Sequence, residues 1–242
     1  MPKHLNKTAI EWTDYTWNVV TGCENNCPYC YARTNSRRFH RSFEPTFHLD
    51  RLSIANTPIG AKVFVCSMGE LFGPWVSARW TDAVLNEVRE LPDVTFQLLT
   101  KFPENLAQWN PWPDNAWVGA TVDNNESLEC ALKGLSSVQS TVRFISFEPL
   151  QGPIDTDKAV FCVLTDSSDI QELAWFGLHD LDWVIIGAET GNRKGKPALE
   201  DVHEWAAEII HAADAAGVPV LLKDNLRRPI QRREWPVPQR QP

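Results

Sequence analysis

The sequence predicts an α/β fold: a parallel (β/α) barrel, partial or open, with about six to seven strands. Three observations support this prediction. After residue 60, short apolar runs rich in β-branched residues alternate with helical patterns. The runs lie far enough apart in sequence for a helical crossover between parallel strands. Most runs end in polar or ionisable residues, and the strand ends of a parallel barrel meet at one mouth. A doubly wound open sheet is the alternative.

The expected elements follow in chain order. The run 17–21 (WNVVT) is an apolar, β-branched strand that leads directly into a group of cysteines. The same composition predicts strands over 62–66, 95–99, 117–121, 142–147, 183–187 and 218–222. Apolar residues at helical spacing predict helices over 77–90, 125–135 and 199–216, and a shorter helix over 103–109.

The length of 242 residues suits one domain. We expect a single domain over 1–228, with an insertion of mixed polarity near 151–182. The tail 229–242, which ends in PVPQRQP, is expected to run over the surface or to be disordered.

The composition is that of a globular protein, with 43% hydrophobic and 22% charged residues. No apolar run approaches the ~20 residues of a membrane span, and the N-terminus has no apolar signal-peptide core. These features predict a cytoplasmic protein without a membrane partner. The net charge of −8 argues against a globally basic nucleic-acid coat protein.

Positive charge is nevertheless concentrated in two segments. The first contains Arg33, Arg37, Arg38 and Arg41. The second, 223–242, contains Lys223, Arg227, Arg228, Arg232, Arg233 and Arg240. Two interpretations are open. Both segments are ordinary solvated surfaces, or they contact phosphates and nucleic acid is a partner.

The spacing of the cysteines matters more than their number. In a reducing compartment, six cysteines do not indicate a disulfide framework. Cys23, Cys27 and Cys30 are close enough in sequence to reach one metal centre from a tight loop. A structural zinc site needs four protein ligands, and neither His40 nor His48 has zinc-ribbon spacing. A [4Fe–4S] cluster held by three cysteines leaves one iron open for an exogenous ligand.

The pattern Cys23-x-x-x-Cys27-x-Tyr29-Cys30, placed after a first strand, resembles the radical S-adenosylmethionine superfamily. Seven segments extend the resemblance to a bacteriophage-associated radical S-adenosylmethionine-like family of unknown function. They are 10–22, 63–72, 96–103, 117–122, 143–154, 182–191 and 216–223. The resemblance implies a TIM-barrel-like fold, a [4Fe–4S] cluster on the three cysteines and S-adenosylmethionine as the second cofactor.

The resemblance also implies roles for individual positions. Tyr29 lies where the superfamily has an aromatic residue near the adenine, and the segment after the second strand would hold the methionine amino group. The implied cofactor-binding residues are Tyr29, Ser67, Met68, Glu70, Thr121, Asp123, Ser146 and Gly187. The implied catalytic residues at the strand ends are Lys101, Glu148 and Glu189. Cys66 is either a hydrogen-atom donor or, more commonly for such a residue, a small buried cysteine.

We therefore expect an iron–sulfur enzyme that reductively cleaves S-adenosylmethionine to a 5′-deoxyadenosyl radical, with electrons from an external donor. The substrate is unidentified. A nucleic acid or nucleotide is favoured by the arginine-rich segments, and a peptide or small metabolite by the acidic net charge. The alternative from another class is a non-catalytic interaction protein whose cysteines bind zinc or a structural cluster.

Overall fold

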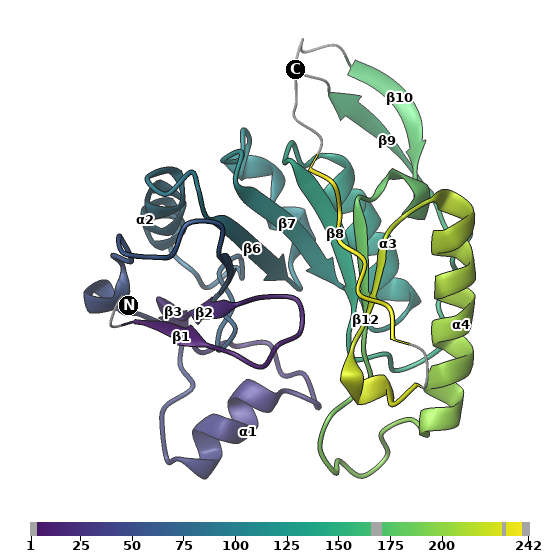
Figure 1. The fold of residues 1–242 in the computed structure, drawn as a ribbon, viewed down its shortest axis with the longest axis horizontal. Helices are drawn as coiled ribbons and strands as arrows, with labels where there is room; N and C mark the ends of the chain where they lie inside the picture. Colours follow the sequence, from purple (N-terminus) through teal and green to yellow (C-terminus); the bar gives the residue numbers. More distant parts are fainter. Residues whose placement is uncertain (1–3, 166–170, 229–230, 239–242) are drawn as a thin grey trace. The chain divides into compact units, whose positions relative to one another are not determined.

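The computed structural model describes residues 4–165, 171–228 and 231–238. Its main sheet has eight strands in the order β1-β2-β5-β6-β7-β8-β11-β12, and within the described residues it does not close on itself (Figure 1). The strands are β1 (Leu5–Lys7), β2 (Tyr15–Trp17), β5 (Lys62–Val65), β6 (Thr95–Thr100), β7 (Ala116–Thr121), β8 (Val142–Phe147), β11 (Trp183–Ile186) and β12 (Val220–Leu222). The predicted open, mostly parallel α/β architecture is confirmed. The antiparallel edge strand β1 was not predicted.

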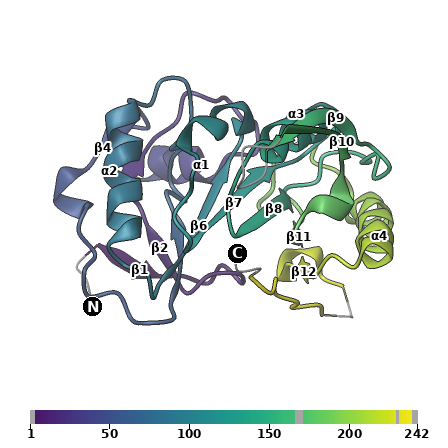
Figure 2. The same cartoon turned by 90° about the horizontal axis from the view of Figure 1, so that it is seen from above.

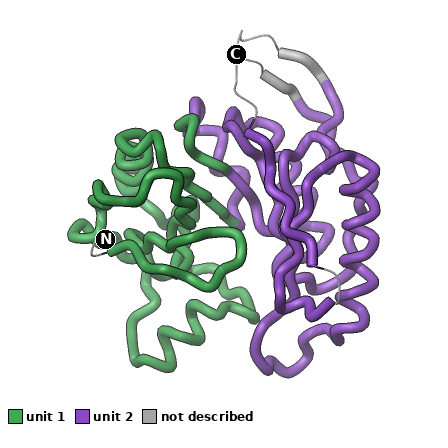
Figure 3. Tube along the Cα trace, in the orientation of Figure 1, with its two compact units in different colours: residues 1–100, 113–117 green, residues 101–112, 118–242 purple. Residues whose placement is uncertain are grey.

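The chain divides into two compact units (Figure 3). Unit 1 comprises residues 1–100 and 113–117, and unit 2 comprises residues 101–112 and 118–242. The boundary passes through β7, so neither unit is a continuous segment of chain.

Unit 1 is organised around the parallel strands β2, β5 and β6. Trp17 on β2 is fully buried and lies edge-on to Phe96 on β6, with 6.0 Å between the ring centroids. The helices are α1 (Tyr31–Arg38) and α2 (Ala78–Arg89). Helix α2 buries Thr81, Val84, Leu85 and Val88, the face that helical periodicity predicts.

The expected first strand over 17–21 is wrong in one respect, because it divides into two strands. β2 ends at Trp17, and β3 (Val20–Thr21) pairs antiparallel with β4 (Thr46–Phe47) in a separate sheet. The chain leaves the main sheet at Asn18. The Asn18 side-chain oxygen accepts a hydrogen bond from the Met68 amide at 2.8 Å, and its main-chain oxygen accepts one from Arg51 at 3.2 Å.

The predicted short helix over 103–109 is also wrong. This segment forms two 3₁₀ turns, η2 (Pro103–Asn105) and η3 (Ala107–Trp109). The first turn packs closely on Gly134 of helix α3 (Asn125–Ser136), where a Cβ would lie 2.4 Å from the Pro103 oxygen. Short 3₁₀ turns are common connectors of this length.

Unit 2 is organised around the parallel strands β8, β11 and β12. The long helix α4 (Leu199–Ala216) runs beside β12 in both views (Figures 1 and 2). It buries a stripe of Val202, Ala206, Ile209 and Ala213 and ends at Gly217, whose φ of 70° permits the left-handed helix cap. None of the described helices is long and apolar enough to span a membrane.

The expected insertion near 151–182 contains an antiparallel hairpin of β9 (Val160–Thr165) and β10 (Gln171–Phe176), followed by the 3₁₀ turn η4 (Leu178–Asp180). Of the expected tail, residues 231–238 are described and lie along the edge strand β12. The Leu222 amide bonds to the Arg232 oxygen at 3.0 Å, and the Glu234 amide bonds to the Val220 oxygen at 3.2 Å. The rest of the tail, including Arg240, lies outside the described residues.

Candidate functional site

The three clustered cysteines lie on the loop between β3 and α1, and each is partly exposed. Cys30 is the N-cap of α1, and its sulfur accepts a hydrogen bond from the Arg33 amide at 3.3 Å. The Cys30 amide in turn donates to the Cys27 oxygen at 3.2 Å. The Cys30 sulfur therefore lies at the start of α1, where a main-chain amide of the first helical turn donates to it.

Arg33 holds this loop in place. One guanidinium nitrogen donates to the Cys23 oxygen at 2.8 Å and to the Asn25 oxygen at 3.0 Å. The guanidinium also lies 4.8 Å from the centroid of the Phe43 ring. Arg33 was placed by sequence in a basic surface segment, but the structure assigns it to loop positioning.

The loop is joined to the segment after β5 through two glycines. The Gly22 amide donates to the Met68 oxygen at 3.0 Å, and the Glu70 amide donates to the Gly22 oxygen at 3.3 Å. Gly22 has φ +83°, and a Cβ there would lie 2.2 Å from the Glu44 main-chain oxygen. At Gly69 a Cβ would lie 2.9 Å from the Thr21 Cα. Only glycine permits this close backbone approach.

Ser67 and Met68 are fixed by residues that the sequence analysis did not identify. Asn18 accepts hydrogen bonds from the Ser67 hydroxyl at 3.2 Å and from the Met68 amide, and the Tyr31 hydroxyl donates to the Ser67 oxygen. Asn18 falls inside the strand predicted over 17–21, so the search for polar residues at strand ends passed over it.

Glu70 is buried, with 6% of its surface exposed. Its Oε1 accepts hydrogen bonds from the Thr100 hydroxyl at 2.7 Å and from the Phe72 amide at 2.9 Å. Burial, together with the negative charges of Glu70, Cys27 and Cys30, raises the pKa of the Cys23 thiol to about 12. Burial likewise raises the pKa of the nearby Cys66 thiol to about 12, so this cysteine is protonated. A protonated thiol is compatible both with a hydrogen-atom donor and with a small buried cysteine.

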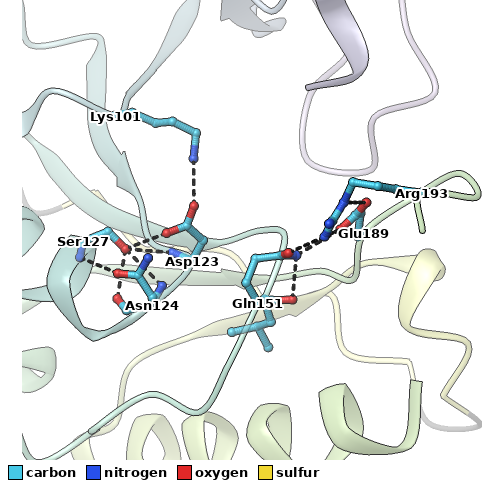
Figure 4. A network of polar contacts seen from close by, with 8 residues as sticks. Lys101, Asp123, Asn124, Ser127, Gln151, Glu189 and Arg193 are labelled. Carbon is cyan, nitrogen blue, oxygen red and sulfur yellow. Dashed lines mark hydrogen bonds and ion pairs between the residues drawn. The ribbon is translucent and has the colours of Figure 1, made fainter. Parts of the chain in front are cut away.

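In unit 2, polar residues follow each parallel strand. Figure 4 shows Lys101 and Asp123, whose Nζ and Oδ2 atoms are 3.7 Å apart. Ser127 donates to Asp123 Oδ1 at 3.0 Å, and Asn124 caps α3 by accepting from the Ser127 amide at 2.9 Å. The start of α3 therefore orients the Asp123 carboxylate beneath Lys101.

Glu189 is held by Arg193 and Gln151 (Figure 4). Arg193 donates to both Glu189 oxygens at 2.7 Å, and Gln151 Nε2 donates to Oε2 at 3.1 Å. The Glu189 side chain is only 4% exposed. Burial acts to raise the pKa of this carboxyl, but the hydrogen bonds from Arg193 and Gln151 outweigh it, and the pKa lies below its ordinary value.

Glu148, after β8, pairs with Lys223, after β12, at 2.6 Å. Asn225 donates to Glu148 at 3.3 Å and to the Ala188 oxygen at 2.7 Å. A Cβ at Gly187 would lie 3.0 Å from the Glu148 carboxyl carbon, so a small residue is needed there. Glu148 and Glu189 thus lie at the same end of two neighbouring parallel strands, as the barrel prediction requires.

Ser146, on β8, is 1% exposed, and its hydroxyl has no hydrogen-bond partner among the described residues. Thr121, the last residue of β7, is partly exposed. Within unit 1 the structure brings together the cysteines and the Ser67–Met68–Glu70 segment. Within unit 2 it groups the remaining predicted residues at the strand ends. It adds positioning partners that the sequence analysis had not given this role: Asn18, Arg33, Thr100, Gln151, Arg193, Lys223 and Asn225.

A family profile described as "Protein of unknown function (DUF5131)" matches residues 7–229. The chain belongs to the DUF5131 family. No curated protein matches this DUF5131 chain in sequence.

Solved structures of spore photoproduct lyase are similar to the DUF5131 chain in fold. One variant of the lyase has a TM-score of 0.55 at 9% identity, over 90% of this chain and 79% of that chain. The lyase complexed with dinucleoside spore photoproduct has a TM-score of 0.51 at 8% identity, over the same shares. A third structure, with bound AdoMet and dinucleoside spore photoproduct, is similar over 60% of this chain and 48% of that chain, with a TM-score of 0.49 and 12% identity.

The three cysteines of the loop in this DUF5131 chain are ligands of the kind that an iron–sulfur cluster requires. Iron–sulfur clusters are bound by cysteine thiolates, and this loop presents three partly exposed cysteines. In the described part of the chain, no three His, Cys, Asp or Glu side chains are already gathered as a metal site. Cluster binding would therefore have to draw the thiols together and, given the high pKa of Cys23, release protons.

We expect Glu189→Gln to reduce the loss in unfolding free energy that the protein shows as the pH falls. Because the folded-state pKa of Glu189 is lowered, its ion pair contributes stability above the unfolded value of about 4.5 and loses it as the pH falls through the folded pKa. Urea denaturation at pH 7 and pH 4 should show a smaller loss for the variant than for the wild type. Glu208→Gln, at an exposed position of α4, is the control and should decline like the wild type. Parallel loss in all three proteins would contradict the expectation.

Proposed function

We propose that this DUF5131 protein is a radical S-adenosylmethionine enzyme in which Cys23, Cys27 and Cys30 hold a [4Fe–4S] cluster. The observation that carries the proposal is the connection of the cysteine loop to the segment after β5. Gly22, which precedes Cys23, pairs with Gly69 in the turn after β5, and the Asn18 side chain accepts a hydrogen bond from the Met68 amide of that turn. A loop braced on both sides is suited to hold a cofactor whose ligands come from both segments.

A cluster held by Cys23, Cys27 and Cys30, with an external electron donor, would supply the one-electron reduction that reductive cleavage of S-adenosylmethionine requires. The protein's part is to bind and orient. The Ser67–Met68–Glu70 segment would hold the methionine end, and Tyr29 and Gly187 the adenine. Thr121, Asp123 and Ser146 would bind the remaining polar groups, and the unpartnered, buried Ser146 hydroxyl is a group that a ligand would satisfy.

Lys101, Glu148 and Glu189 are proposed to act by electrostatics. Each forms an ion pair within unit 2. The pKa of Glu189 lies below its ordinary value, which makes this carboxylate a poor proton acceptor. These residues would therefore set the charge and shape of the substrate pocket instead of transferring protons.

We further propose a nucleic acid or nucleotide as the substrate class. The fold resembles that of a lyase solved in complex with a dinucleoside photoproduct, and the cysteine loop leads into helix α1, whose last turn is basic. The acidic net charge of −8 supports a peptide or small metabolite as the second candidate.

The test is anaerobic purification followed by iron, sulfide and product analysis. We expect about four irons per chain and, with S-adenosylmethionine and dithionite, release of 5′-deoxyadenosine. Cys27→Ala should lose both. Cys130→Ala, which removes an exposed cysteine on α3, should keep both and is the matched control. Stoichiometric zinc without 5′-deoxyadenosine would instead establish a non-catalytic binding protein.

A further inference from the structure

The C-terminal end of α1 carries an exposed basic and aromatic group. Arg37, Arg38, Phe39, His40 and Arg41 follow one another there, and all five are exposed. We refer to these five residues as the α1 knob. Phe39 is 60% exposed, an unusual position for a large aromatic side chain in water.

The geometry of the knob is built by the backbone. The Arg41 amide donates to the Ser36 oxygen at 2.8 Å, and the His40 amide donates to the Arg37 oxygen at 3.2 Å. These two bonds define a Schellman motif, which requires a left-handed residue after the cap. His40 occupies that position with φ +51°, where glycine is usual. The reversal brings Arg41 back toward the helix end.

As a result, two arginines lie close to one ring. The Arg38 and Arg41 guanidinium groups lie 5.8 Å and 5.6 Å from the centroid of Phe39. Cation–π contact at this distance orients both groups without neutralising them. The knob therefore presents an exposed aromatic ring next to positive charges.

The knob arginines differ from those of the tail. In residues 4–165, 171–228 and 231–238, no carboxylate pairs with Arg37, Arg38 or Arg41. Arg232, by contrast, is paired with Asp214 and Glu234, and Arg233 with Asp224. Of the two basic segments in the sequence, the α1 knob is therefore the one whose arginines are all exposed and all without a carboxylate partner among the described residues. Like charges held together are destabilising unless an anion offsets them.

We propose that the α1 knob is a docking site for single-stranded nucleic acid. Its three arginines bind successive phosphates, and Phe39 stacks on an unpaired base. Arginine matches phosphate geometry, and aromatic stacking accepts any base face. A duplex would bury its bases away from the ring, so an unpaired strand suits the surface better than a double helix does.

The knob also lies at a useful distance from the cysteine loop. Cys30 caps the N-terminus of the eight-residue helix whose other end is the knob. At about 1.5 Å per residue, the two are separated by roughly 12 Å, or two to three nucleotides of extended strand. A strand docked on the knob can therefore extend toward the cysteine loop. This role in substrate capture rests on the proposed function, whereas the binding itself does not.

The experiment is fluorescence anisotropy with a labelled 12-nucleotide single strand and the anaerobically purified protein. We expect the triple variant R37Q/R38Q/R41Q to lose at least tenfold in affinity at low salt. The slope of log affinity against log salt should become shallower by about two, since each phosphate contact on a single strand contributes about 0.7. Phe39→Leu should weaken binding several-fold without changing the slope, because it removes stacking and leaves the charge.

The matched control is the triple variant K7Q/R79Q/R89Q, which removes three exposed positive charges elsewhere in unit 1. It should bind like the wild type. Equal losses in both triple variants, no effect of Phe39→Leu, or equally tight binding of polyglutamate would each overturn the proposal. If the R37Q/R38Q/R41Q variant loses oligonucleotide binding but still releases 5′-deoxyadenosine, the docking site is separate from the chemistry. If the wild-type protein binds the oligonucleotide but does not cleave S-adenosylmethionine, only the proposed function is refuted.

Discussion

Replacing Gly22 with alanine should destabilise the protein by roughly 2–5 kcal/mol and prevent iron loading. Two costs add at this position. The residue has φ +83°, which is strained for any side chain, and the new Cβ would meet the Glu44 main-chain oxygen at 2.2 Å. Both obstacles are backbone, so no side-chain rotation relieves them. The alanine side chain therefore has to break either the Gly22–Gly69 contact or the β3–β4 pairing, and both of these hold the cysteine loop in place.

Gly60→Ala provides the matched control. Gly60 is also in unit 1 and has φ +77°, but a Cβ there would meet nothing within 4 Å. Its replacement should cost only about 1 kcal/mol, the conformational penalty alone. Urea denaturation measures both variants, and iron content after anaerobic purification gives the second readout. Equal destabilisation would show that the close approach at Gly22 is relieved easily, and normal iron loading in Gly22→Ala would remove this contact from the proposed cluster site.

The architecture was largely predictable because periodicity records burial. The segments 142–147 and 199–216 were predicted at the bounds observed for β8 and α4, since an apolar run or stripe has to face the core. The strand over 17–21 failed for a long-range reason. Its apolar residues continue beyond Trp17, but Asn18 is bound to the turn after β5, some fifty residues later in sequence. Local composition holds no information about that contact.

The cysteines and strand-end carboxylates of the candidate site could be predicted from the sequence, but the residues that position them could not. Cysteine spacing indicated the loop, and polar strand ends indicated Glu148 and Glu189. The residues that position them come from elsewhere in the chain: Lys223 reaches Glu148 across 75 positions. Arg33 looked like surface charge because its neighbours in sequence are basic, yet it binds two loop carbonyls. Pairings of this kind depend on the three-dimensional register of parallel strands, which sequence patterns do not specify.

Ending the chain at Arg228 should cost roughly 2–4 kcal/mol and promote aggregation. The buried Trp183 indole donates to the Glu234 oxygen at 2.9 Å and stacks on Trp235 at 5.2 Å between ring centroids. Removing the tail leaves a buried indole donor unsatisfied and exposes the hydrogen-bonding edge of β12, the last strand of the sheet.

The matched control is a chain ending at Pro238, which keeps the described contacts of the tail and should have the midpoint of the full-length protein in urea. A pair of point variants isolates the stacking contribution. Trp235→Ala should lower the unfolding free energy by about 2 kcal/mol, whereas Trp175→Ala, at a side chain that is 62% exposed, should change it by less than about 1 kcal/mol. If the chain ending at Arg228 were as stable as the full chain, the tail would be dispensable to the fold. Its paired arginines, Arg232 and Arg233, would then be available for other contacts.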